Sequence, residues 1–362
     1  MHRKSSSAVV RTALTMIISA SLLLSSGCTS VLDLLQDEEC FWASYPTIEW
    51  NEDNPKATIL QLETYLQRLE KRIVISGGRE LEWNDVCRRC YWVNTFVVSE
   101  PGISDKRMYE FTYLPDAEEN NQQRRLIDKE VKDIVSSIPQ YADEWESVLC
   151  VHDELISRVR YTSTEDADKS NSHIYDLYGA LVNHEAVCQG YVYAMDYILD
   201  ELGIKYEDVV SDTHIWSRLP DIDGSEKYID VTWDDIDEVD KFGKPYILHN
   251  CMYITAEEMS LLSEHEVSKE LPADGNSTGS NYFRANGGIV RAGETNLVSQ
   301  EIERQIETGV NLVQLRFERK FDYDEVHDNI KEYVYSTDYS GSFVIWNDDD
   351  LLILSIGLYF KE

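Results

Sequence analysis

Three short motifs between residues 179 and 235 constrain the fold of this chain most strongly. The motifs are AVCQGY at 186–191, THIWSRL at 213–219 and KYIDVTWDD at 227–235. From Cys188 onward, apolar residues recur at helical spacing as far as Leu202, and Gly203 then provides the residue that helix C-termini favour. The first motif therefore predicts a helix that begins close to Cys188.

A cysteine in the first turn of a helix lies where unpaired backbone N–H groups and the helix dipole stabilise a thiolate. The other two motifs predict a β-hairpin, because a polar DIDGSE stretch with an Asp-Gly turn signal separates them. His214 falls in the first strand and Asp230 in the second, so their side chains are expected within hydrogen-bonding reach. Cys188, His214 and Asp230 are therefore candidates for the nucleophile, the base and the orienting carboxylate of thiol acyl transfer.

The order of these three residues and the sequence around them resemble the transglutaminase-like core family, a branch of the papain-like thiol enzymes. The matching stretches are YGALVNHEAVCQGYVYAMDYILDELGI, HIW and IDVTWDD, in that order along the chain. The similarity runs from about Trp145 to about His265, a third of the chain. At 215–217 the chain has Ile, Trp and Ser where the family commonly has Ala, Trp and Asn. The larger Ile215 is expected to narrow the cleft and so to affect substrate size.

The resemblance implies an α+β fold whose papain-like, transglutaminase-like core packs a nucleophile helix on an antiparallel sheet. It also implies that Cys188 attacks an amide carbonyl of a protein or peptide and forms a thioester, while His214 transfers protons and Asp230 orients the histidine. Resolution by water would make the protein a cysteine peptidase or amide hydrolase, which is the favoured expectation. Resolution by an amine would make it a transglutaminase, and a third alternative is a non-catalytic surface binding protein on the same fold. No cofactor and no metal ion is expected.

The residues around this candidate triad offer a second oxyanion donor and walls for a cleft. The backbone N–H of Cys188 at the helix N-terminus would be one donor, and Tyr175 or Tyr178, just upstream, would supply another. Trp216 and Trp233 adjoin the base and the carboxylate and would line the cleft, with simple core packing as the alternative. We therefore expect Tyr178, Trp216 and Trp233 near the reacting atoms.

The N-terminal residues are typical of an export signal. An apolar run of twelve residues, Ala13 to Leu24, follows several basic residues and is too short for a membrane-spanning helix, which needs ~20. The run ends in LLLSSGC, which resembles the lipobox of bacterial lipoproteins and predicts cleavage before Cys28 and lipidation of that residue. An ordinary signal peptide is the alternative. The expected location is the outer face of a bacterial cell membrane, with attachment through the lipid alone.

The formal net charge of −34 limits the partners of the chain. Such an acidic surface repels nucleic acid, so nucleic-acid binding is not expected.

Among the seven cysteines, Cys87 and Cys90 form a C-x-x-C pair without the second pair that a zinc site of this type requires. A local disulfide or two unreactive thiols are expected there, since an exported chain permits oxidation. The expected partner is a protein or peptide substrate.

Composition divides the chain into six expected segments. They are a signal peptide at 1–27, a tether at 28–55, an N-terminal helical and strand extension at 56–142, the transglutaminase-like catalytic core at 143–270, a linker at 271–281 and a small C-terminal α+β accessory domain at 282–362. The linker is predicted from its composition, LPADGNSTGS. The segment beyond it has no cysteine and a single histidine, so we do not expect it to contribute to catalysis.

Two further features of the core each have a structural and a functional interpretation. His152 lies on the apolar stripe of a helix predicted at 143–160, where a hydrogen-bonded core histidine is favoured over a site residue. The acidic run from Asp234 to Asp240 suggests calcium, but its spacing lacks the ligand pattern of a calcium loop. We expect a solvated loop there.

Overall fold

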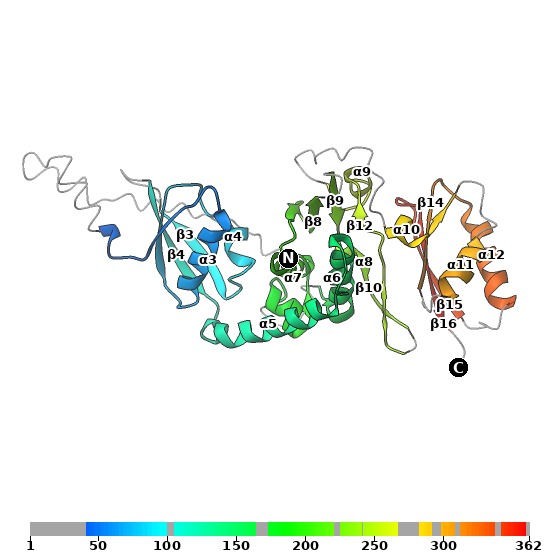
Figure 1. Ribbon diagram of the computed structural model, residues 1–362, viewed down its shortest axis with the longest axis horizontal. Coiled ribbons are helices and arrows are strands. Elements are labelled where there is room, and N and C mark those ends of the chain that lie inside the picture. Colours follow the sequence, from blue (N-terminus) through cyan, green and yellow to red (C-terminus); the bar gives the residue numbers. More distant parts are fainter. Residues whose placement is uncertain are drawn as a thin grey trace, which may run out of the picture. The chain divides into compact units, whose positions relative to one another are not determined.

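The computed structural model describes several stretches of the chain (Figure 1). They are residues 41–99, 105–163, 173–220, 225–240, 242–266, 282–291, 298–307, 312–336 and 342–359. The predicted signal peptide, Cys28 and the predicted linker at 271–281 lie outside these residues. Within the described stretches, none of the helices combines the length and apolarity that a membrane span requires. The described residues form two compact units, which divide between Asp128 and Lys129.

The first unit is built on a sheet with the strand order β1-β2-β4-β3. Its elements are β1 (Thr47–Glu49), α3 (Pro55–Leu66), β2 (Arg72–Ser76), α4 (Trp83–Cys87), β3 (Val93–Val98), β4 (Lys106–Tyr113) and the 3-10 helix η1 (Ala117–Glu119). β1 runs parallel to β2, whereas the other neighbouring strands are antiparallel. Helix α3 begins at Pro55 because the Asn54 side chain caps it by accepting the backbone N–H of Ala57.

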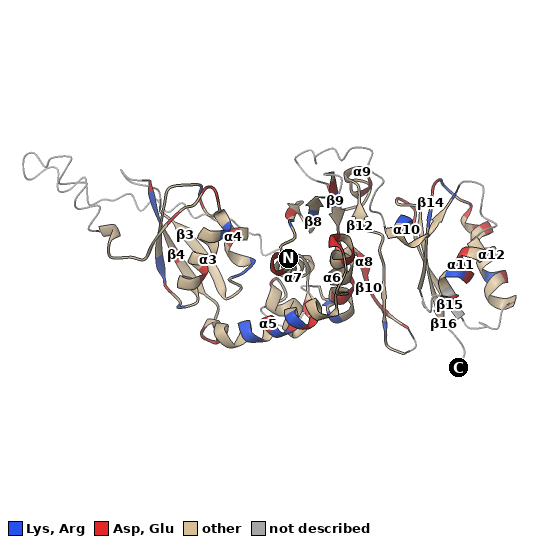
Figure 2. Ribbon diagram, viewed as in Figure 1, with Lys and Arg blue, Asp and Glu red and all other residues tan. Residues whose placement is uncertain are grey.

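Helix α5 (Asn120–Ser137) contains the point at which the two units divide. Ile127, Val131 and Ile134 are buried, as the helical period of its apolar residues predicts. Basic and acidic residues alternate on its surface (Figure 2), and Lys129 pairs with Asp133 one turn later at 3.3 Å. The helix therefore has one apolar stripe and one mixed-charge face.

The second unit contains the helix predicted at Cys188, which is α7 (Cys188–Leu202), and the predicted hairpin. The antiparallel sheet that includes this hairpin has the order β12-β9-β8-β7, with β7 (Glu207–Val210), β8 (Ile215–Pro220), β9 (Glu226–Ile229) and β12 (Met252–Ile254). Helix α7 packs against β8 and against α6 (Glu144–Arg158). A cysteine-bearing helix on an antiparallel sheet is therefore observed, as predicted.

Shorter elements connect these parts of the second unit. They are β5 (Arg160–Tyr161), the π-helix η2 (Gly179–Asn183), β6 (Glu185–Ala186), α8 (Val231–Asp234), β10 (Asp235–Val239), β11 (Pro245–Ile247) and α9 (Ala256–Met259). The acidic run forms a strand instead of the loop that we expected, because β10 pairs with β11, whereas Asp237 and Glu238 are exposed to solvent as expected. Asp234 is fully buried and accepts the backbone N–H of Cys251, and Asp235 accepts the Tyr191 hydroxyl at 2.5 Å. These acids have internal partners, which explains the ordered structure.

The C-terminal segment adds a further sheet covered by helices. Its elements are α10 (Tyr282–Asn286), β13 (Ile289–Val290), α11 (Val298–Glu307), β14 (Leu312–Phe317), α12 (Tyr323–Ser336), β15 (Ser342–Asp348) and β16 (Ile353–Tyr359). The strand order is β13-β14-β16-β15, with β13 parallel to β14 and the remaining pairs antiparallel. The described chain is therefore an α+β protein.

The C-terminal segment packs directly on the core sheet. One cluster of buried side chains joins the core residues Trp216 and Tyr228 to residues from the C-terminal segment, namely Phe283, Leu351 and Ile353. Burial of a large apolar side chain stabilises a fold by ~1.5–3 kcal/mol. The core sheet and the C-terminal segment therefore share a hydrophobic interior, while the domain boundaries that we derived from composition stay predictions.

Replacing Ile353 with Ala tests this shared interior. Ile353 is 0% exposed in the cluster, so the change should lower the free energy of unfolding of the second unit by ~2–5 kcal/mol, measured by urea denaturation. The control Leu261→Ala removes a leucine that is 52% exposed, and it should change the free energy by less than about 0.5 kcal/mol. Equal effects of the two substitutions would contradict the shared interior.

Candidate active site

Cys188 is the first residue of α7, and its thiol is free and partly exposed. Gly190 allows this end of the helix to lie close to the preceding chain. A Cβ atom at Gly190 would come within 2.7 Å of the Ala186 side chain and 3.0 Å of the Ile174 carbonyl oxygen. The glycine of the CQG motif therefore determines how closely the cysteine approaches that chain. Backbone N–H groups of the first helical turn lack acceptors within the helix and favour negative charge beside them.

His214 and Asp230 lie at adjoining ends of the hairpin strands. His214 comes one residue before β8 and Asp230 one residue after β9, so each lies just outside the strand in which we expected it. Nε2 of His214 lies 2.5 Å from Oδ2 of Asp230. Oδ1 of Asp230 accepts the backbone N–H groups of Thr232 at 3.0 Å and Trp233 at 3.1 Å, because Asp230 caps α8. The capping bonds orient the carboxylate so that Oδ2 is directed to the histidine.

The side chain of His214 also interacts with Cys188, so the ring bridges the thiol and the carboxylate. Burial opposes protonation of His214, but Asp230 and then Cys188 outweigh this effect and raise the pKa of His214 to about 10. Burial also favours the neutral form of Asp230, but His214 and then His265 lower the pKa of Asp230 to about 2. The structure therefore holds His214 and Asp230 as an imidazolium–carboxylate pair at neutral pH.

A second histidine, His265, contacts the same carboxylate oxygen and was not among the predicted site residues. Its Nε2 lies 2.8 Å from Oδ2 of Asp230, and its Nδ1 lies 2.7 Å from the carbonyl oxygen of Ser263. The rings around His265 are those of His214, Trp216 and Trp233, at centroid separations of 5.0, 4.6 and 5.0 Å. His265 follows Asp230 by 35 residues. No local motif marks it, so only the fold reveals this contact.

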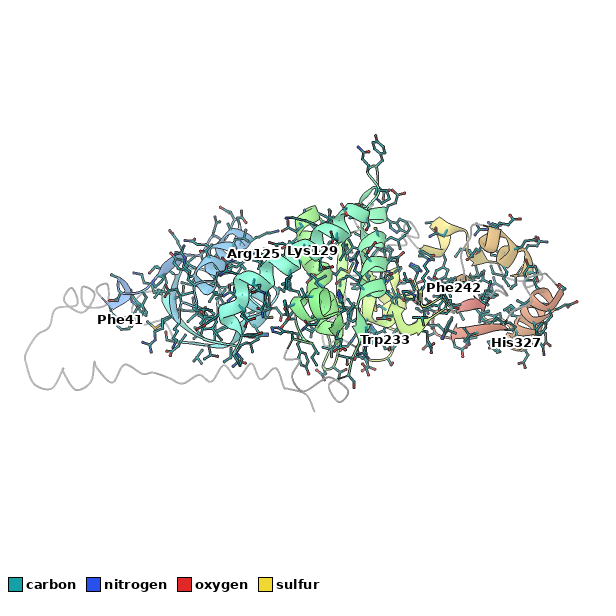
Figure 3. All side chains as sticks on the ribbon, turned by 90° about the horizontal axis from the view of Figure 1, so that it is seen from below. Phe41, Arg125, Lys129, Trp233, Phe242 and His327 are labelled. Carbon is teal, nitrogen blue, oxygen red and sulfur yellow. The ribbon has the colours of Figure 1, made fainter. Side chains whose placement is uncertain are left out.

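The predicted cleft residues lie in different surroundings. Trp216 stacks on His214 with a centroid separation of 5.9 Å, but it is fully buried and so supports the histidine instead of lining an open cleft. Trp233 (Figure 3) contacts the His214 ring and is partly exposed. It lines a cavity of about 510 Å³ together with residues 346–350. Tyr178 packs edge-on against His173 at 4.9 Å. Of the three predicted cleft residues, Trp233 is therefore the one that lines a cavity.

Tyr161 of β5 is another aromatic residue that interacts electrostatically with Cys188. Burial raises the pKa of Tyr161, and the negative charge of Cys188 contributes to the same shift. The side chain is 40% exposed. Tyr161 therefore joins Tyr175 and Tyr178 as a candidate donor beside Cys188, although the sequence motifs did not single it out.

Two other predicted features have clear structural positions. Cys87 and Cys90 are buried thiols, which agrees with the second of the two expectations for this pair. Burial raises the pKa of Cys90, so its thiol is unreactive at neutral pH. His152 is fully buried and both of its ring nitrogens are hydrogen-bonded, as predicted for a core histidine.

No family model and no curated protein matches the chain. Among solved structures, a TGase (transglutaminase) is similar over 55% of this chain and 62% of that chain, with 15% identity and a TM-score of 0.27. Menin, whose structure revealed the binding site for the Mixed Lineage Leukemia protein, is similar over 58% of this chain and 46% of its own, with 15% identity and a TM-score of 0.25. A proposed cysteine protease from Cytophaga hutchinsonii is similar over 42% of this chain and 65% of its own, with 12% identity and a TM-score of 0.23. Each match spans less than two thirds of the other chain.

Proposed function

We propose that this protein is a thiol enzyme that hydrolyses amide bonds of protein or peptide substrates through Cys188, His214 and Asp230. The observation that carries the proposal is the position of the His214 ring, which bridges the Cys188 side chain and the Asp230 carboxylate. A nucleophile, a base and an orienting group in contact are the set that covalent acyl transfer needs. From the N-terminal sequence we also propose that the enzyme is exported and anchored by a lipid on Cys28.

The proposed reaction passes through a thioester. The Cys188 sulfur attacks the amide carbonyl carbon and forms a C–S bond, and the C–N bond breaks as His214 gives its proton to the leaving amine. Water then loses a proton to His214 and attacks the thioester, which releases the carboxylic acid and returns the thiol. Asp230 keeps the imidazole oriented and stabilises its protonated form in both steps.

The N-terminus of α7 is the proposed source of oxyanion stabilisation. The backbone N–H of Cys188 would donate to the oxyanion, and the hydroxyl of Tyr161, Tyr175 or Tyr178 would supply the second hydrogen bond. Loss of one such donor typically lowers kcat by ~10²–10³-fold. Single Tyr→Phe substitutions therefore identify the second donor by their effect on kcat.

His265 is proposed as a positioning residue for the Asp230 carboxylate. Its Nδ1 is held by a backbone carbonyl, and its Nε2 contacts Oδ2 of Asp230 at 2.8 Å. The contact with this ring therefore holds the carboxylate independently of His214. The Asp230 carboxylate would therefore keep its orientation toward His214 during proton transfer.

A peptide library tests the proposed reaction and separates hydrolysis from amine transfer. The purified chain is incubated with the library and a labelled primary amine, and the products are identified by mass. We expect cleaved or deamidated peptides from the unaltered chain and none from Cys188→Ala. Products that carry the amine would assign transglutaminase activity to the same residues, whereas turnover by Cys188→Ala would contradict the proposal.

Cys188 should react with iodoacetamide faster than the other described cysteines near neutral pH, because its thiol is partly exposed at a helix N-terminus and lies beside the protonated His214 ring. Cys150 is the matched control, since it is also partly exposed while burial raises its pKa. Peptide mapping after brief labelling measures both rates. His214→Ala should slow labelling of Cys188 and leave Cys150 unchanged. Labelling of Cys188 only after denaturation would rule out an accessible nucleophile.

The His214–Asp230 pair should make stability depend on pH. The pKa of His214 is raised from 6.5 to about 10, so its stabilisation is fully present below pH 6.5 and is lost as the pH rises through 10. A Cys188→Ala background excludes ionisation of this thiol but also removes its share of the shift, so the range ends below pH 10. Above pH 6.5 the free energy of unfolding should fall by up to ~1.4 kcal/mol per pH unit. His214→Gln in the same background should reduce this slope but not remove it, because the pKa of His152 is also raised, to about 9. Urea titrations at several pH values measure it, and equal slopes would contradict the pairing.

Replacing His265 separates a positioning role from a purely structural one. A hydrogen bond to a charged group contributes ~1.5–3 kcal/mol, so His265→Ala should lower kcat by at least about tenfold, with KM little changed. His265→Gln should restore part of the loss, because its amide can still donate to Asp230. His327→Ala, on α12, is the control. Equal kcat values for the Ala and Gln variants would argue against the hydrogen bond as the cause.

A further inference from the structure

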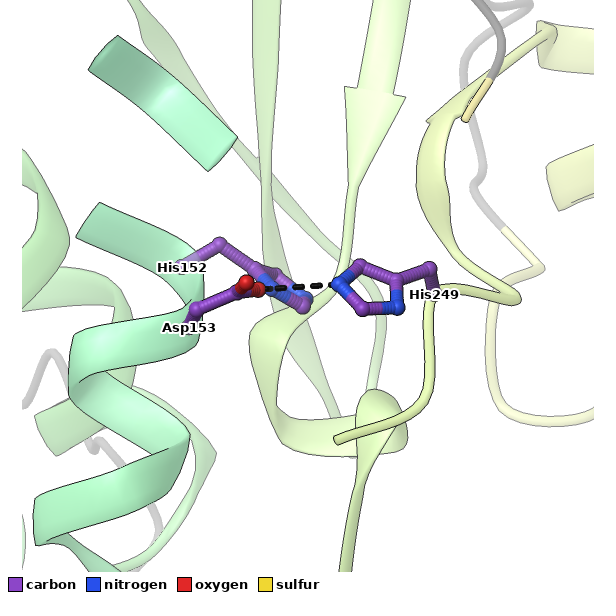
Figure 4. Close-up of side chains that lie close together, drawn as sticks. All are labelled: His152, Asp153 and His249. Carbon is purple, nitrogen blue, oxygen red and sulfur yellow. Dashed lines mark hydrogen bonds and ion pairs between the residues drawn. The ribbon is translucent and has the colours of Figure 1, made fainter. Parts of the chain in front are cut away.

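A second group of histidine and carboxylate side chains lies in the unit formed by residues 129–362 and shares no residue with the proposed triad. We name it the α6 cluster: His152 and Asp153 come from α6, and His249 comes from the segment after β11 (Figure 4). Nδ1 of His152 and Nε2 of His249 each lie 2.9 Å from the same oxygen, Oδ1 of Asp153. Two imidazole nitrogens and one carboxylate oxygen therefore converge.

The other nitrogen of each ring faces an oxygen acceptor. Nε2 of His152 lies 3.1 Å from Oδ2 of Asp234, and Nδ1 of His249 lies 2.7 Å from Oε1 of Gln314. The Gln314 amide has a defined orientation, because its Nε2 donates to a buried hydroxyl on β16 at 3.2 Å. An amide oxygen only accepts, so His249 donates outward through Nδ1 and directs Nε2 toward Asp153. Histidines that bind metals usually donate their second nitrogen to a carboxylate or carbonyl in this way.

Packing holds both rings in these orientations. His152 is 0% exposed, and the His249 ring stacks on Tyr282 with a centroid separation of 3.7 Å and an interplanar angle of 2°. The Asp153 side chain is 37% exposed. It also lines a surface cavity of about 370 Å³. The two histidine rings are therefore held rigidly in the interior, and the partly exposed Asp153 side chain gives an ion access to them from solvent.

We propose that the α6 cluster binds a divalent transition-metal ion, with Zn²⁺ as the best match. Nδ1 of His152, Nε2 of His249 and the Asp153 carboxylate are the ligands, and water takes the fourth position on the exposed side. Imidazole with carboxylate suits Zn²⁺, whereas Ca²⁺ and Mg²⁺ prefer oxygen ligands alone. Ligand atoms of a tetrahedral zinc ion lie roughly 3.3 Å apart. The present 2.9 Å spacing is that of hydrogen bonds, so binding of the ion releases the shared protons to solvent and the three ligand atoms move slightly apart.

The bound ion would connect elements that are distant in the sequence. It joins α6 to the segment after β11, and the outer acceptors Asp234 and Gln314 extend the connection to α8 and to β14 of the C-terminal segment. Asp234 ends the helix that Asp230 caps. A bound ion would therefore stabilise α8, the helix that orients the Asp230 carboxylate, without itself contacting substrate.

Titration of the full chain with Zn²⁺ tests the proposal. A Cys188→Ala background is used, because a reactive thiol would itself bind the ion. Calorimetry should show one Zn²⁺ per chain, and the melting temperature should rise on binding. Asp153→Asn and His249→Gln should each weaken binding by more than ~100-fold, and Gln314→Leu, which removes an outer acceptor, by ~10–100-fold.

Asp328→Asn is the matched control. His327 and Asp328 are also a neighbouring histidine–aspartate pair on a helix, α12 (Figure 3), with Nδ1 and Oδ1 3.8 Å apart. They are not part of a cluster of three potential ligands in the described chain. The affinity for Zn²⁺ should therefore be unchanged in Asp328→Asn. If Asp328→Asn lowered the affinity as much as Asp153→Asn does, the ion would be responding to surface charge alone, and the proposal would be overturned.

Co²⁺ provides a second readout that does not depend on folding of the ligand variants. In the Cys188→Ala chain it should give the visible bands of nitrogen and oxygen coordination without a thiolate charge-transfer band. His265→Gln should keep these bands, because His265 belongs to the separate group with His214 and Asp230. The proposal is overturned if no stoichiometric binding occurs, if folded Asp153→Asn and His249→Gln retain full affinity, or if His265→Gln abolishes the Co²⁺ bands. None of these outcomes depends on amide hydrolysis.

Discussion

The buried carboxylate of Asp230 is the interaction on which the candidate active site depends. One oxygen caps α8 through two backbone N–H groups, and the other contacts His214 and His265. A buried carboxylate without partners is costly, so these four contacts are what permits a charged group at 1% exposure. The charge in turn keeps His214 protonated next to Cys188. Loss of Asp230 would therefore disturb the helix cap and both rings together.

Helix α8 extends this dependence into the rest of the second unit. Asp230 precedes it and Asp234 ends it, and both carboxylates are buried. Asp234 accepts the backbone N–H of Cys251 and contacts His152 of α6. The single-turn helix therefore has a buried, hydrogen-bonded carboxylate at each end, one belonging to the proposed triad and the other to the outer contacts of the α6 cluster. The C-terminal segment completes the arrangement, because it supplies Gln314 to that cluster and apolar side chains to the core sheet.

Local sequence signals predicted local structure well. Helical spacing after Cys188 and the glycine at 203 predicted α7 and its end, and Gly203 has the positive φ of 73° that such an end requires. The Asp-Gly signal predicted the β8–β9 hairpin. Local signals failed for Asp234 and Asp235 of the acidic run, because polarity alone cannot show that an acid has an internal partner. They also could not show that Trp216 belongs to a buried cluster that includes side chains of the C-terminal segment.

The sequence by itself determined which residues carry the proposed chemistry and which elements present them, because motif order, helical periodicity and turn chemistry depend on near neighbours. The tertiary structure alone decided that His265 shares the Asp230 carboxylate and that His152, Asp153 and His249 converge. These contacts join residues that are 35 positions apart in one case and 96 in the other. Such pairs form only when α6, the hairpin and the C-terminal segment pack around one interior. Packing of this kind depends on the summed burial of many side chains, and no short stretch of sequence encodes it.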